Sequence, residues 1–269
     1  MLGSLVCRAE AFCEPWFEDW ARRLGMDDPS KPFEQRNVHR KVWEWVCIVQ
    51  ALHERGCLRE GAKALGFAVG RERLPALFAS FGVNVLASDS GDPGVAEKWS
   101  KTREYTGALD GLYYPQFLPR EAFDQRVRYQ HLDMRDLSGL ERGAYDFVWS
   151  ACALEHLGSL EAGADYIVAA TRLLRPGGVA VHTTEFNISS LDQTRDNADT
   201  VFYRRMDLEQ LGARLRSEGA GLAPLDLEPG LHEYDLKFDA RPFYEGGRKH
   251  LKLSLGGFIV ASVMLIVQN

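Results

Sequence analysis

Short apolar runs alternate with amphipathic segments through most of this chain, starting near residue 61. Apolar runs bounded by Gly, Asp or Pro are typical of buried strands, and apolar positions repeating every three or four residues are typical of helices. Strands that alternate with helices predict a mainly parallel sheet that helices cover on both faces. The expected strands are residues 64–69, 83–88, 128–132, 145–150 and 179–184, and the clearest helices are 74–81, 159–174 and 207–219.

The two ends of the chain differ from this alternating middle. Residues 1–60 contain two aromatic-rich stripes at helical spacing, so we expect a helical N-terminal cap on a main domain of residues 61–269. Residues 258–267 are rich in β-branched residues and too few to cross a membrane, which predicts a buried last strand. The polar segment 232–235, H-E-Y-D, predicts a solvated hairpin near the C-terminus that shapes a substrate pocket.

Composition excludes several classes of protein. The net charge is −6, and no basic stripe with interleaved aromatic residues is present, which argues against nucleic acid binding. The five cysteines are odd in number and contain no C-x-x-C pair, which disfavours a disulfide framework or a structural zinc site. The first ten residues lack the charged leader of a secretory signal, so we expect a cytoplasmic protein.

A turn rich in small residues, G-F-A-V-G-R, ends the first expected strand. Gly66, Ala68 and Gly70 alternate there, which allows a tight turn and close approach of a ligand, and Asp89 ends the next strand. Strand, turn, helix, strand and acid is an arrangement that holds adenosine, with the acid accepting from ribose hydroxyls. Arg71 occupies the place where a dinucleotide site needs a small residue. Ala68 fits a turn with negative φ and is strained in one with positive φ.

The order of these and later motifs resembles the class I S-adenosylmethionine-dependent methyltransferases with a type 11 core. Asp133-Met134 follows the third strand, S-A-C-A-L-E-H-L follows the fourth, and L-R-P-G-G precedes the fifth. The resemblance implies a Rossmann-like, seven-stranded α/β sheet and S-adenosylmethionine as cofactor. It places the glycine turn at the methionine part, Asp89 at the ribose and Asp133-Met134 beside adenine. The implied cofactor-binding residues are Gly66, Phe67, Ala68, Gly70, Asp89, Asp133, Met134 and Ser150.

The side of the pocket that takes the methyl acceptor is less defined. Ligands of open α/β sheets lie beyond the carboxyl ends of the strands, which directs attention to His156, His182 and Glu185 as candidate bases. The alternative for His156 is a structural or adenine-side role, and the alternative for His182 is a hydrogen-bonded core histidine. No metal is expected, because the residues that would have to meet, Glu185 with His232 and Asp235, lack a recognised ligand spacing.

Three hypotheses about function remain open at this point. The first is methyl transfer to an oxygen or nitrogen of a small-molecule or sugar-containing acceptor. The second is an α/β enzyme that depends on NAD or a nucleotide sugar, and the third is a non-catalytic partner subunit that keeps the cofactor site. Expected partners are a small-molecule acceptor, no nucleic acid and no membrane span, with a homodimer left open.

Overall fold

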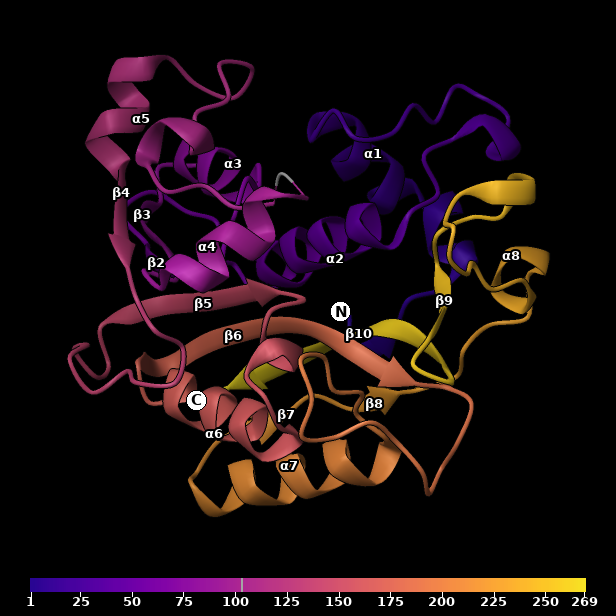
Figure 1. Ribbon diagram of the computed structural model, residues 1–269. Coiled ribbons are helices and arrows are strands. Elements are labelled where there is room, and N and C mark those ends of the chain that lie inside the picture. The colour runs from indigo at the N-terminus through magenta and orange to yellow at the C-terminus, as the bar shows by residue number, and fades with distance from the viewer. Residues whose placement is uncertain (103) are drawn as a thin grey trace.

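A computed structural model describes residues 1–102 and 104–269 and contains one mixed sheet at its centre (Figure 1). Its strands run in the order β4-β3-β2-β5-β6-β10-β1-β8, and β7 and β9 also pair with β10. The strands are β1 Ser4–Val6, β2 Lys63–Phe67, β3 Asn84–Asp89, β4 Val127–His131, β5 Tyr145–Ala151, β6 Leu174–Asn187, β7 Gly221–Leu222, β8 Leu225–Asp226, β9 Lys252–Leu255 and β10 Phe258–Gln268.

The half of the sheet from β4 to β6 is parallel throughout. The carboxyl ends of its strands therefore meet at one edge, where the loops after β2, β3, β4 and β5 converge. β10 runs antiparallel to β6, from Val260 opposite Asn187 to Gln268 opposite Val179. The expected α/β sheet with helices on both faces is confirmed, although short strands bring its count in the described residues to ten.

Helices cover both faces of the sheet, with α1, α2 and α3 on one side and α6 and α7 on the other (Figure 1). Each layer has its own apolar core, one around Trp43, Phe78 and Trp149 and the other around Phe67 and Tyr166. The α-helices are α1 Pro15–Arg23, α2 Arg40–Glu54, α3 Leu74–Ser80, α4 Pro93–Ser100, α5 Arg120–Arg126, α6 Leu160–Thr171, α7 Arg205–Ser217 and α8 Glu233–Leu236. The 3-10 helices are η1 Ala9–Cys13, η2 Phe33–Gln35, η3 Leu109–Leu112, η4 Leu154–His156 and η5 Glu245–Gly247.

The first 60 residues are joined closely to the sheet. The two predicted helices are present as α1 and α2, but Ser4–Val6 forms strand β1, which pairs with both β10 and β8. Val42, Val46 and Val49 of α2 are buried in the same core as α3. The apolar stripe of α2 thus packs on the sheet, and the first turn of the helix comes to lie over the ends of β5 and β6.

The expected hairpin at 232–235 is wrong, because this segment forms the short helix α8, whose N-terminus is capped by the His232 side chain. Asp235 is buried, accepts a hydrogen bond from the Ala9 N–H at 3.0 Å and lies 3.3 Å from the Lys252 ammonium. Burial and this ion pair turn the segment inward. All five cysteines are free. Within residues 1–102 and 104–269, no helix is both long and apolar enough to span a membrane.

Candidate active site

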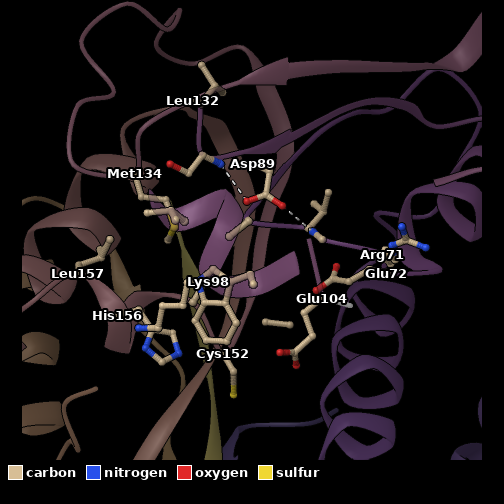
Figure 2. Close-up of a pocket in the computed structure, with 18 of the residues that line it drawn as sticks. Arg71, Glu72, Asp89, Lys98, Glu104, Leu132, Met134, Cys152, His156 and Leu157 are labelled. Atoms are coloured by element: carbon tan, nitrogen blue, oxygen red, sulfur yellow. Dashed lines mark hydrogen bonds between the residues drawn. The ribbon is translucent and has the colours of Figure 1, made fainter. Parts of the chain in front are cut away.

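A cavity of about 430 Å³ opens at the carboxyl ends of the parallel strands (Figure 2). The loops after β2, β3, β4 and β5 form most of its wall, and α2 and α4 close it with Lys41, Trp45, Lys98 and Trp99. Six of the residues predicted from sequence line it: Ala68, Gly70, Asp89, Asp133, Met134 and His156. The cavity therefore brings the expected cofactor motifs and one candidate base together.

The structure shows that the glycine turn has positive φ at Ala68, which the sequence could not decide. Ala68 has φ of 50° and Gly70 has φ of 51°, both in the left-handed region. A Cβ at Gly70 would lie 1.9 Å from the Glu104 carbonyl oxygen, so no larger residue fits. For alanine this backbone conformation costs about 1–2 kcal/mol. Gly66 has a different role, because a Cβ there would lie 2.3 Å from the Trp149 ring, which makes its small size a packing requirement.

Asp89 ties this turn to the end of β3. Its Oδ2 accepts a hydrogen bond from the Gly70 N–H at 3.1 Å, and its Oδ1 accepts one from the Ser90 N–H at 2.8 Å, as Figure 2 shows. Burial raises the pKa of this carboxyl group to about 6, although the two backbone donors oppose the shift. At neutral pH the group is ionised, so a carboxylate stands at the wall of the cavity beside the turn.

Asp133 and Met134 form a neighbouring part of the wall. Arg135 donates to both carboxylate oxygens of Asp133, with Nε 3.0 Å from Oδ1 and Nη2 2.8 Å from Oδ2. These bonds lower the pKa of Asp133. Met134 is buried, and together with Leu132 it gives this part of the cavity an apolar surface suited to a flat ring.

Five predicted site residues do not line the cavity: Gly66, Phe67, Ser150, His182 and Glu185. Phe67 packs edge-on against Tyr166 of α6, with ring centroids 5.4 Å apart. Ser150 Oγ lies 2.8 Å from His182 Nδ1 inside the sheet, and His182 is fully buried. Burial lowers the pKa of His182 to about 3. His182 is therefore a neutral core histidine and cannot take a proton from a ligand in the cavity.

His156 lies at the cavity wall with a defined tautomer. Its Nδ1 is 2.8 Å from the carbonyl oxygen of Asp199, and a carbonyl can only accept, so Nδ1 bears the hydrogen. Nε2 therefore keeps its lone pair. Burial lowers the pKa of His156, which keeps the ring neutral at physiological pH. The Trp99 ring packs against it at 4.8 Å between centroids.

A buried ionic network lies behind this wall and links α2 to β6. The Arg40 guanidinium binds both carboxylate oxygens of Glu185, one of them through Nη1 at 2.9 Å. Glu44, which is fully buried, lies 2.8 Å from Lys41 Nζ and accepts a hydrogen bond from Ser262 at 2.6 Å. Although burial would raise the pKa of Glu44, Lys41 and Arg40 lower it to about 2.

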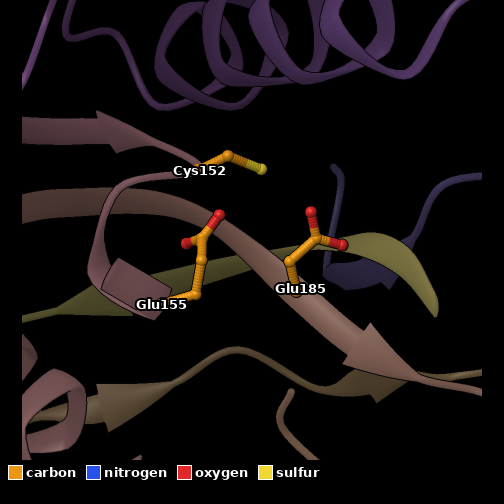
Figure 3. Close-up of side chains that lie close together, drawn as sticks. All are labelled: Cys152, Glu155 and Glu185. Atoms are coloured by element: carbon orange, nitrogen blue, oxygen red, sulfur yellow. The ribbon is translucent and has the colours of Figure 1, made fainter. Parts of the chain in front are cut away.

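Glu185 is therefore one layer behind the cavity, where it meets two further polar side chains. Cys152, Glu155 and Glu185 converge, with their ligand atoms within 4.8 Å of one another (Figure 3). Burial and the charge of Glu185 raise the pKa of Glu155. His232 and Asp235, the other members of the metal set considered from sequence, do not belong to this group. Arg40 already supplies the positive charge that Glu185 requires.

Sequence reasoning assigned no role to Arg40, Lys41, Glu44 or Glu72, although all four lie in or behind the cavity wall. One signal was available in α2, where Arg40 and Glu44 are four residues apart on a helix whose neighbouring positions are apolar. Charged residues at that spacing inside an apolar stripe indicate either that the edge of the helix is exposed to solvent or that the two residues form a buried ion pair. Only the contact with Glu185, 145 positions away, decides between these two.

The fold and the cavity define an α/β protein that binds a nucleotide-like ligand beyond the ends of its parallel strands. Comparison with known proteins narrows this class. Residues 65–182 match the family model of a methyltransferase domain, type 11. No curated protein sequence matches the chain.

A solved structure with a TM-score above 0.5 supports the fold. A protein from Galdieria sulphuraria, provisionally named a sarcosine dimethylglycine methyltransferase, is 16% identical with a TM-score of 0.51, and the alignment covers 82% of each chain. An S-adenosylmethionine dependent methyltransferase from Mesorhizobium loti is 13% identical with a TM-score of 0.49, over 82% of this chain and 96% of that one. Residues 65–182 thus match a methyltransferase domain, and this match supports an enzyme that uses S-adenosylmethionine as its cofactor.

Proposed function

We propose that this enzyme methylates an oxygen or nitrogen atom of a small-molecule acceptor, including one that contains a sugar. The observation that supports this most directly is the position of His156. A neutral imidazole whose Nε2 has a lone pair, with Glu155 Oε1 4.0 Å away, stands in the same cavity as the glycine turn and Asp89. Hydroxyl and ammonium acceptors must lose a proton when they are methylated, and such an imidazole can take it.

The residues at the wall fit the cofactor that the family uses. Gly70 brings the turn to the cavity wall, Asp89 offers an ionised carboxylate for the ribose hydroxyls, and Leu132 with Met134 offers an apolar face for adenine. S-adenosylmethionine supplies the methyl group, and its transfer depends mainly on how donor and acceptor are positioned. We assign the space beside Lys41, Trp45, Cys152 and His156 to the acceptor.

On this assignment, each side of the acceptor space has a task. Trp45 and Trp99 give apolar walls that exclude water, and His156 accepts the acceptor's proton at Nε2. The Asp199 carbonyl holds the ring in the tautomer that this step requires. Arg40 and Glu185 fix the first turn of α2 over this space and do not contact the acceptor.

Calorimetry with S-adenosylhomocysteine tests the cofactor assignment. We expect the wild type to bind at micromolar concentration and Asp89→Ala to weaken binding more than tenfold, because the ribose hydroxyls lose a charged acceptor. The isosteric Asp89→Asn variant separates loss of charge from loss of shape. An unchanged affinity for S-adenosylhomocysteine in both folded variants would show that Asp89 does not bind the ribose. A separate assay of methyl transfer to a panel of hydroxyl and amine compounds would distinguish an enzyme from a non-catalytic subunit.

A further inference from the structure

Glu72, the second residue after the glycine turn, is a buried acid at the cavity wall. It lies beside the turn, as Figure 2 shows, and the residue is only 5% exposed. Trp149 Nε1 donates one hydrogen bond to its Oε2 at 3.0 Å. Among the residues that the structure describes, no cation forms an ion pair with it. One carboxylate oxygen is thus available on the side of the cavity.

The nearby cations are already engaged. Lys41 Nζ lies 2.8 Å from Glu44, and Arg71 is exposed and donates Nε to the Tyr105 carbonyl at 3.2 Å. A buried carboxylate without a cation is unfavourable, and such groups take up a proton instead. Burial accordingly raises the pKa of Glu72 to about 8, so most of it is protonated at neutral pH.

We infer that Glu72 is the counter-ion for the α-ammonium group in the methionine part of the cofactor. This inference rests on the proposed function and on the methionine part lying along the glycine turn. Glu72 is two residues beyond Gly70, and its second carboxylate oxygen suits an N–H donor with a positive charge. The α-carboxylate at the same end of the ligand would be repelled there, so the geometry orients the amino acid part as well as binding it.

A proton must leave Glu72 when the ammonium group arrives. An adjacent positive charge favours the ionised form of a carboxyl group, and the released proton passes to the buffer. The other charged groups that act on Glu72 are Lys41 and Glu44 from α2 and Asp89 from β3, and burial together with the charge of Glu72 in turn raises the pKa of Tyr114. Lys41 favours ionisation of Glu72, whereas Glu44 and Asp89 oppose it. The positive charge of the bound ammonium group is therefore what converts Glu72 to its ionised form.

Titration calorimetry of the full chain can count this proton. At pH 7.5, binding of S-adenosylhomocysteine is measured in phosphate and in Tris, whose ionisation enthalpies differ. We expect the wild type to release about 0.8 proton per ligand, as a group with pKa near 8 requires. Glu72→Gln keeps an acceptor for Trp149 and should abolish the release and weaken binding at least tenfold. The control Glu97→Gln, at an exposed residue of α4 that pairs with Lys101, should release the same proton as the wild type.

A second ligand identifies the recognised group. Methylthioadenosine has the nucleoside and the sulfur but no amino acid part, so Glu72→Gln should change its affinity less than threefold. Proton release near zero in the wild type, with equal S-adenosylhomocysteine affinity in Glu72→Gln, would overturn the inference and leave the proposed function intact. A loss confined to S-adenosylmethionine would assign Glu72 to the sulfonium instead and overturn the ammonium assignment. Failure of the folded wild type to bind either cofactor form would overturn both.

Discussion

The side of the cavity that we assign to the methyl donor and the side that we assign to the acceptor are built on different physical principles. The donor side consists of backbone conformation and single side chains, namely a left-handed turn at Ala68 and Gly70 with Asp89 hydrogen-bonded to it. The acceptor side consists of His156 in front of a buried ionic network in which Arg40 of α2 binds Glu185 of β6. The donor side is local in sequence, and the acceptor side joins segments far apart in the chain.

This difference determines what a substitution does on each side. On the donor side, a change of one residue alters ligand affinity or the strain of one turn. On the acceptor side, a change behind the wall leaves a charge buried without its partner, so the whole fold responds. The following predictions test that contrast, from the largest expected effect to the smallest.

Substitution of His156, the base that we propose, should have the largest effect of all, and this effect should be a loss of turnover without a loss of cofactor affinity. His156→Gln deletes the Nε2 lone pair, and we expect kcat to fall about 10²–10⁴-fold, which is the usual contribution of general base catalysis. Affinity for S-adenosylhomocysteine should change less than threefold. The measurement is methyl transfer to whichever acceptor in a hydroxyl and amine panel the wild type uses best. Turnover equal to that of the wild type would exclude His156 as the base and leave the acceptor to ionise without help.

Arg40→Met should cause the largest loss of stability. It leaves Glu185 buried without a cation, and breaking such a pair costs about 3–5 kcal/mol of the free energy of unfolding. The double variant Arg40→Met with Glu185→Met should recover most of this loss, since both charges are then removed. Urea unfolding measures both variants.

The matched control for that experiment is Arg59→Met. Arg59 pairs with Asp146, but its side chain is 48% exposed, so we expect a change of about 1 kcal/mol or less. If Arg40→Met were no more destabilising than Arg59→Met, the ionic network would not hold α2 on the sheet. The acceptor side would then be as local in its energetics as the donor side.

The same contrast explains what could be predicted from the sequence. The strands and the donor motifs follow from apolar runs, spacing and small residues, all of which act over short stretches of chain. The role of His182 could not be settled in this way, because β6 is buried on both faces and alternation along the strand no longer separates core from cavity. The sequence predicts a hairpin where α8 forms, because Ala9 and Lys252, the partners of the buried Asp235, are distant in sequence.

Glu72 should make stability depend on pH on the donor side. Burial raises its pKa from 4.5 to about 8, so the native state binds the proton more tightly than the unfolded state. The resulting stabilisation is fully present below pH 4.5 and is lost as pH rises through 8. Without cofactor, Glu72→Gln should therefore be more stable than the wild type above pH 8, by on the order of 5 kcal/mol, and similar to it near pH 4. Urea unfolding across this range checks it, and parallel curves for the two proteins would contradict the prediction.

Ala68→Gly should change the stability of the protein least, and it should increase stability, whereas most substitutions in a strand or turn decrease it. Ala68 has φ of 50°, a conformation that glycine adopts without strain, so we expect stability to rise by about 0.5–1 kcal/mol. The matched control is Ala64→Gly in β2 of the same segment, where the strand conformation is ordinary and glycine should destabilise by about 1 kcal/mol. Both are measured by urea unfolding without ligand. If Ala68→Gly destabilised the protein as much as Ala64→Gly, the turn would not be strained. Strain in the turn could then no longer distinguish the donor side from the acceptor side with its buried ionic network.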